Sequence, residues 1–126
     1  KRGKIMITDI LIDKLDKFDF RNMDFDTMLD RRDLPIFDDE WIRVYHEVEL
    51  LKRKSNVYID GNNDSDNIRK QTFLKTFKLT QDDEIAAYIS DDFGLIYDSE
   101  MLGYHDEWLD RLINCYHSFQ FPSGEL

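Results

Sequence analysis

Residues 80–103 read TQDDEIAAYISDDFGLIYDSEMLG, and apolar side chains recur through this stretch at helical spacing. At 100° per residue, Ile85, Ile89 and Ile96 point within about 40° of one another. The first four residues have the spacing of a capping box, and Gly103 interrupts the pattern. The stretch therefore predicts one long helix that begins at the capping box of residues 80–83 and ends at Gly103.

The polar residues of this stretch predict a second, outward side of the same helix. Glu84, Asp91 and Asp98 are seven residues apart, so a helix stacks them on one face that a partner could contact. Gly94 projects away from the predicted core and costs a helix about 1 kcal/mol relative to Ala. It therefore either lets another backbone come close or marks a local break.

Asp92 differs from the other carboxylates, because its direction lies between Tyr88 and Ile85 on the apolar side. A buried carboxylate without a partner is strongly destabilising. We therefore expect a structural contact to an Arg, a Tyr hydroxyl or a helix N-terminus rather than a catalytic acid. The candidate cationic partners are Arg43, Arg69 and Arg111.

The triplet Asp92-Phe93-Gly94 also occurs in the magnesium-binding loop of protein kinases. A chain of 126 residues is about half the length of a kinase domain. It also has no glycine-rich phosphate loop, no V-A-I-K lysine and no H-R-D loop. The triplet is therefore interpreted as a chance match.

The remainder of the chain shows the same helical periodicity, and no stretch shows sustained strand alternation. The sequence predicts a single all-α domain over residues 1–126, a helical bundle of five or six helices. Besides residues 80–103, the helical segments are 8–19, 23–32, a strong one from residue 38 to 54, 67–78 and 105–119. A short strand near residues 56–60 is left open.

The one clear loop is predicted at residues 55–67, which are rich in Asn, Asp, Ser and Gly. Its alternating polar residues resemble the first half of a calcium-binding EF-hand loop: Asp60, Asn62, Asp64 and Asp66. However, Ser65 stands where the sharp turn needs Gly, and Gln71 stands where a bidentate Glu is required. A polar capping loop is the favoured interpretation.

Metal, cofactor and catalytic sites are not expected. The histidines His46, His105 and His117 form no recognised zinc motif, and Cys115 lies on the apolar side of the last predicted helix. No nucleophile elbow, phosphate-binding loop or dinucleotide fingerprint is present. The prediction is therefore a non-enzyme with no catalytic residues, no cofactor and no metal ligands.

Charge is distributed very unevenly along the chain. The formal net charge is −10, and residues 79–126 contain 11 acidic residues against a single basic one, Arg111. Such a field attracts a basic protein and repels nucleic acid and anionic membranes. Asp9 and Asp13 interrupt the apolar run near the N-terminus, and a lone cysteine suits a reducing compartment, so we expect a cytoplasmic location without membrane contact.

Residues 80–122 resemble the C-terminal part of small acidic immunity proteins from bacterial toxin–immunity pairs, including contact-dependent growth inhibition systems. The shared features are a D-D-F-x-L-I helix, a glycine, and an acidic W-L-x-x-L helix. The resemblance implies tight, stoichiometric binding to a toxin domain, often a nuclease with a basic surface. No toxin-contacting residue follows from it.

The leading hypothesis is a non-catalytic immunity protein that covers a basic groove of a cognate toxin with its acidic C-terminal face. The alternative is an acidic adaptor or nucleic-acid mimic that acts on another basic protein; direct binding of nucleic acid is not expected. Charge would steer association, and aromatic residues would anchor it. The predicted partner-binding residues are Glu84, Asp91, Tyr97, Asp98, Tyr104, Asp106, Glu107 and Asp110.

Overall fold

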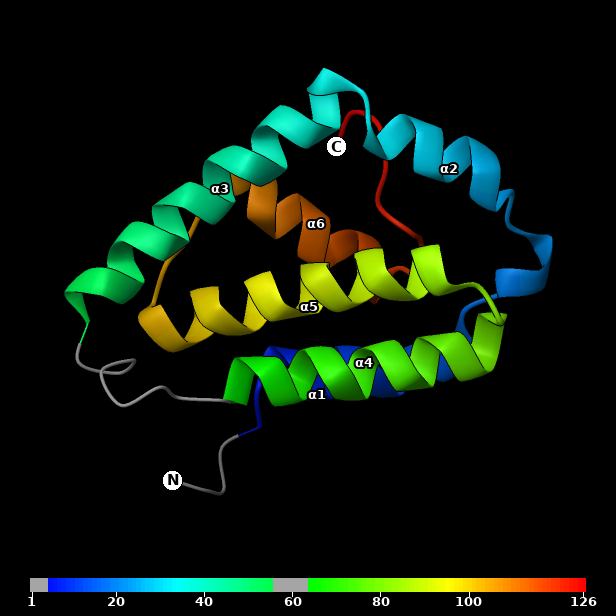
Figure 1. The fold of residues 1–126 in the computed structure, drawn as a ribbon, viewed down its shortest axis with the longest axis horizontal. Helices are drawn as coiled ribbons and strands as arrows, with labels where there is room; N and C mark the ends of the chain where they lie inside the picture. The colour runs from blue at the N-terminus through cyan, green and yellow to red at the C-terminus, as the bar shows by residue number, and fades with distance from the viewer. Residues whose placement is uncertain (1–4, 56–63) are drawn as a thin grey trace.

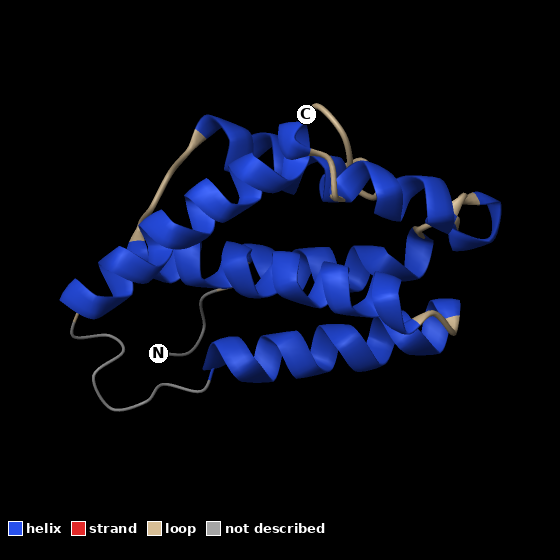
Figure 2. Ribbon diagram, turned by 45° about the horizontal axis from the view of Figure 1, so that its top comes forward, coloured by secondary structure: helices blue, strands red, loops and turns tan. Residues whose placement is uncertain are grey.

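The computed structural model describes residues 5–55 and 64–126, and these residues form helices without any strand. The helices are α1 (Ile7–Lys14), α2 (Phe25–Arg32), α3 (Pro35–Lys54), α4 (Asp64–Thr80), α5 (Asp83–Leu102) and α6 (Glu107–His117). Two short 3-10 turns, Leu15–Lys17 and Phe20–Asn22, join α1 to α2. The predicted all-α bundle is confirmed (Figures 1 and 2).

Helix α5 is the centre of the bundle. In Figure 1 it runs between α4 on one side and α3 and α6 on the other, and α1 is seen behind α4. Ile89, Phe93 and Ile96 are almost completely buried, as the apolar periodicity predicts. Gly103 ends the helix with a φ of 69°, a left-handed conformation that suits glycine at a helix C-terminus.

The N-terminal ends of two helices differ from the prediction by a few residues. Asp82, rather than Thr80, caps α5 by accepting a hydrogen bond from the Ile85 amide, because α4 continues through Thr80. Helix α3 begins at Pro35 instead of at residues 38–39. Proline suits this first helical position, because its fixed φ matches the helix and its missing N–H is not needed there.

Helix α4 packs against α5 through small side chains. Its residues Thr72 and Thr76 are fully buried, whereas Leu74 and Phe77 are exposed. Gly94 of α5 is buried against this helix, and a Cβ there would lie 2.7 Å from carbon atoms of the Arg69 side chain. The prediction that Gly94 points away from the core is therefore wrong. The glycine permits a close approach by α4, and α5 continues through it without a break.

The predicted loop at residues 55–67 is only partly described. Residues 56–60, for which the sequence allows a short strand, lie outside the described residues, as do the first two candidate calcium ligands, Asp60 and Asn62. Asp64 and Asp66 belong to the first turn of α4. The loop is thus shorter at its C-terminal end than the sequence predicts, because helix α4 already begins at Asp64.

Candidate functional site

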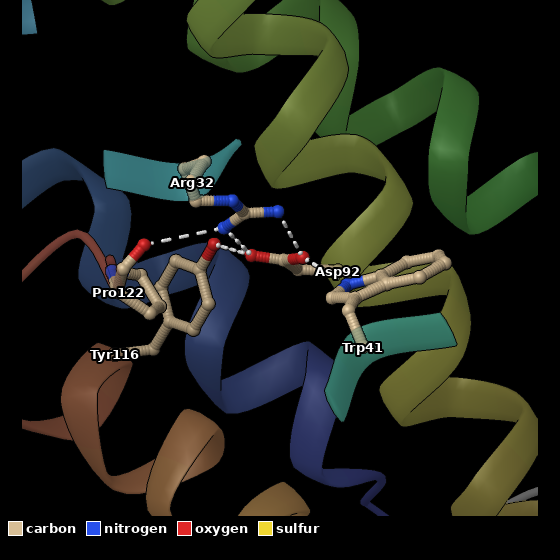
Figure 3. A network of polar contacts seen from close by, with 5 residues as sticks. All are labelled: Arg32, Trp41, Asp92, Tyr116 and Pro122. Atoms are coloured by element: carbon tan, nitrogen blue, oxygen red, sulfur yellow. Dashed lines mark hydrogen bonds and ion pairs between the residues drawn. The ribbon is translucent and has the colours of Figure 1, made fainter. Parts of the chain in front are cut away.

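Asp92 is the centre of a buried polar network (Figure 3). Its carboxylate is fully buried and accepts hydrogen bonds from Arg32 Nη1 and Nη2, at 2.8 and 2.9 Å. Trp41 Nε1 donates to it at 2.8 Å, and the Tyr116 hydroxyl donates at 2.5 Å. Arg32 also donates to the carbonyl of Pro122 at 3.3 Å. Five separate parts of the chain are therefore joined in one network, and three of them donate directly to the Asp92 carboxylate.

The partner of Asp92 is not one of the three arginines predicted from the sequence. Arg32 is the last residue of α2, four residues after Met28 and seven after Phe25, so it shares their face. This helical spacing is the feature of the sequence that could have identified Arg32 as an inward-facing arginine. Burial lowers the pKa of Arg32, but Asp92 more than compensates and raises it, so the guanidinium stays charged. The pair is consequently a neutral unit inside the fold.

Tyr116 completes this unit from the side of α6. Burial and the neighbouring Asp92 carboxylate raise the pKa of its hydroxyl well above the usual value. The hydroxyl therefore remains protonated and can donate to Asp92 at neutral pH. Asp92 therefore links α2, α3 and α6 to α5 through its hydrogen bonds. This is the structural role that its inward direction in the sequence predicts.

A groove lies above this network between α3 and α5; we name it the α3–α5 groove. Two hollows of about 200 and 430 Å³ form it, and both are lined by Trp41 and Asp91. Tyr45 adds a second aromatic ring on α3, stacked on Trp41 with ring centroids 5.5 Å apart. Tyr88 of α5 lines the smaller hollow, and the ion pair between Lys52 and Asp98 closes the far end of the larger one.

The smaller hollow has a strongly acidic rim, formed by Asp33, Asp38 and Asp91. All three carboxylates are exposed, and none forms an ion pair with another described residue. Asp91 is partly desolvated by the groove. This burial, together with the charge of Asp92, raises the pKa of Asp91. The groove therefore combines aromatic rings with exposed carboxylates that form no ion pair with a described residue.

Asp91 and Asp98 are the predicted partner-binding residues that line this groove, and Glu84 lies near it. Asp91 lines it directly, and Glu84 is exposed one turn before Tyr88 on the same helix. The sequence did not single out Trp41, Tyr45 and Tyr88 as anchors, because at helical spacing they could equally have been core residues.

Asp98 and Tyr97 do not face outward as predicted. Asp98 is 4% exposed and forms an ion pair with Lys52, in which Nζ lies 2.7 Å from a carboxylate oxygen. Tyr97 is 8% exposed, and its hydroxyl lies 3.4 Å from a carboxylate oxygen of Asp64 on α4. The C-terminal end of α3 and the first turn of α4 cover these two positions.

The other four predicted residues lie on the opposite flank of α3. Asp106 caps α6 and pairs with Arg43, which lies two residues, or about 200°, from Trp41 on the same helix. Tyr104 is half-buried beside this pair, and Glu107 and Asp110 are exposed on α6. The eight predicted residues therefore do not form one continuous face.

Asp106 is expected to stabilise the protein in a pH-dependent way. Burial tends to raise its pKa, but hydrogen bonds from Arg43 and the Leu109 amide lower it below the usual 3.8. Its contribution to stability is therefore fully present above about pH 3.8. It is lost as the pH falls through the lower pKa that Asp106 has in the folded protein. Asp106→Ala should cost about 1 kcal/mol of unfolding free energy at neutral pH, measured by urea denaturation.

The control for this experiment is Asp106→Asn, since asparagine caps helices nearly as well as aspartate. We expect it to keep the capping contribution and to lose the contribution of the ion pair with Arg43, and the Ala deficit to shrink below pH 3.8. A deficit that does not change with pH would show that the carboxylate charge contributes nothing.

Cys115 is half-exposed, so its predicted burial in the core is wrong. It lies beside Phe119 in a surface hollow next to the C-terminal segment. Burial and the charge of Asp92 raise the pKa of its thiol. Across residues 5–55 and 64–126, no three His, Cys, Asp or Glu side chains are grouped so as to hold a metal ion. None of the described helices combines the length and apolarity needed to cross a bilayer.

Comparison with known families decides what kind of protein presents this groove. The sequence model of the family described as immunity protein PIM1 matches residues 6–123, which includes every element described above. The chain belongs to the immunity protein PIM1 family. No curated protein matches it.

Membership of an immunity protein family indicates a toxin-neutralising role, and such families are generally non-catalytic. The resemblance to immunity proteins seen at residues 80–122 is thereby confirmed and extended to almost the whole chain. In this immunity protein, the fully bonded Asp92 network has a structural role.

Proposed function

We propose that this immunity protein neutralises a cognate toxin by binding it stoichiometrically through the α3–α5 groove, without catalysis. The proposal is carried by one observation: exposed carboxylates without ion-pair partners lie beside aromatic rings in a hollowed surface. Aromatic anchors supply most of the binding energy in typical interfaces, and complementary charge supplies orientation and speed.

The partner in this proposal is a toxin domain with a basic surface, and a nuclease fits best because its substrate is a polyanion. An acidic inhibitor can occupy such a surface in place of nucleic acid. We place this interaction in the cytoplasm, as part of a bacterial contact-dependent inhibition system. The charge of −10 on the chain supports a basic partner.

The aromatic side of the groove supports tight binding because it is held in place before binding. Trp41 is fixed by its hydrogen bond to buried Asp92 and by stacking on Tyr45. A residue that is already ordered loses little conformational entropy when a partner contacts it. Tyr45 is 39% exposed and is therefore available to the partner.

Glu107 and Asp110 have a different part in the proposal. They are exposed on α6, across α3 from the groove, so they contribute to the long-range field rather than to the contact. Substituting both by their amides should slow association and leave dissociation unchanged, whereas Tyr45→Ala should accelerate dissociation. Surface plasmon resonance measures the two rates separately.

The decisive experiment uses the toxin domain encoded next to the immunity gene. Its association rate with this protein should fall about tenfold or more between about 20 and 500 mM salt, because screening removes the steering field. Coexpression should also restore the growth of cells that express the toxin. An association rate independent of salt would contradict electrostatic steering, and a lack of growth rescue would contradict neutralisation.

A further inference from the structure

The smaller hollow of the α3–α5 groove has the composition of a binding pocket for one side chain. Its volume is about 200 Å³, and it lies between the end of α2, the first turns of α3 and the middle of α5. Trp41 and Tyr88 contribute aromatic walls, and Asp33, Asp38 and Asp91 contribute carboxylates. The pocket is a defined concave site rather than a stretch of acidic surface.

The charges around this hollow do not cancel. Arg32 lies beneath it, but both terminal nitrogens of its guanidinium are bonded to Asp92, so this pair is neutral as a unit. Arg69 contributes a positive field near Asp91, and its own ion pair is with Asp66 on α4. Of the charged groups around the hollow, the three rim carboxylates are left without an ion-pair partner.

The aromatic walls select among cations. A guanidinium group is planar and weakly hydrated, so it can stack on an aromatic ring while it donates hydrogen bonds to carboxylates. An ammonium group is more strongly hydrated and gains less from such a site. The protein already uses this chemistry internally, since the Arg32 guanidinium stacks on Tyr88 at 4.9 Å and on Phe37 at 4.3 Å.

We propose that this pocket receives a single arginine side chain of the toxin, with Asp91 and Asp38 as its carboxylate partners and Trp41 as its aromatic wall. The inference rests on the proposed function and names the chemical group that this site recognises. The arginine gains aromatic contact and hydrogen bonds. In return, its charge supplies the ion-pair partner that the rim carboxylates lack among the described residues.

The pocket can be tested without the toxin by NMR titration of the isolated immunity protein. The probe is N-acetyl-arginine methylamide, compared at constant ionic strength with the citrulline and lysine derivatives. Citrulline has nearly the shape of arginine but carries no charge. We expect arginine to shift the Trp41 indole N–H and the Asp91 amide at least about threefold more than citrulline, with lysine intermediate.

The variant Asp91→Asn supplies the matched control, because it keeps the shape of the side chain and removes its charge. It should abolish the difference between arginine and citrulline. Equal shifts with both probes, or shifts that avoid the pocket, would overturn the arginine site. If the arginine probe fails while the toxin still binds with strong salt dependence, the proposed function stands without this pocket.

Discussion

Replacing Asp92 by Ala is expected to lower the free energy of unfolding by about 3–5 kcal/mol, the usual result of breaking a buried ion pair. The variant leaves the Arg32 guanidinium buried without its carboxylate, and it removes the acceptor of the Trp41 and Tyr116 donors. Each unsatisfied buried donor adds its own desolvation penalty. Thermal and urea denaturation followed by circular dichroism measure the loss.

The matched control is the neighbouring residue, Asp91. It is exposed and forms no ion pair with another described residue, so Asp91→Ala should change stability by less than about 0.5 kcal/mol. Nearly equal melting temperatures for the two Ala variants would show that the Asp92 network contributes little.

A second comparison separates the contribution of the Arg32–Asp92 ion pair from that of the Tyr116 hydroxyl. Tyr116→Phe removes only one donor to Asp92 and should cost about 1–3 kcal/mol, which is less than Asp92→Ala. If Tyr116→Phe proves as damaging as Asp92→Ala, the hydroxyl rather than the arginine would be the dominant partner.

Reversing the charge in the groove is expected to have the largest effect on function. Asp91→Lys should weaken toxin binding about 100-fold, equivalent to about 3 kcal/mol, because it sets a cation against a basic partner at the centre of the contact. Asp91 lines both hollows of the groove, so the substitution changes the charge of each. Isothermal titration calorimetry with the purified toxin domain measures the affinity.

The control for that experiment is Asp13→Lys, which makes the same change in net charge. Asp13 is exposed on α1, away from the groove. Its substitution should lower affinity by no more than about threefold, through the long-range field alone. Comparable losses for the two variants would locate the contact outside the groove, while the circular dichroism of each variant reports whether it folds.

The helices themselves could be predicted well because their signals are local. Apolar periodicity placed α5 and the core residues Ile89, Phe93 and Ile96, and Gly103 marked its end. The same periodicity showed that Asp92 points inward. The identity of its partner is long-range information, because Arg32 is 60 residues away in the sequence and only the packing of α2 brings it close.

The prediction that Asp98 and Tyr97 of α5 are exposed was wrong for a related reason. Projection along a helix gives the direction of Asp98 and Tyr97 but not the neighbouring helix that covers them. Helix α4 is a sharper case: its buried side contains Thr72 and Thr76, and its exposed side contains Leu74 and Phe77. No apolar pattern predicts such packing, because the small side chains and Gly94 matter more than hydrophobicity where two helices approach closely.

The double role of Trp41 has a consequence for how toxin specificity can change between relatives. Its indole N–H belongs to the buried network, while its ring lines the groove. Mutations at this position would disturb folding and recognition together. Tyr45, Asp38 and Asp91 have no tie to Asp92, so they are free to vary. We expect diverging members of the family to retain the tryptophan and to exchange the rim around it when they adapt to a new toxin.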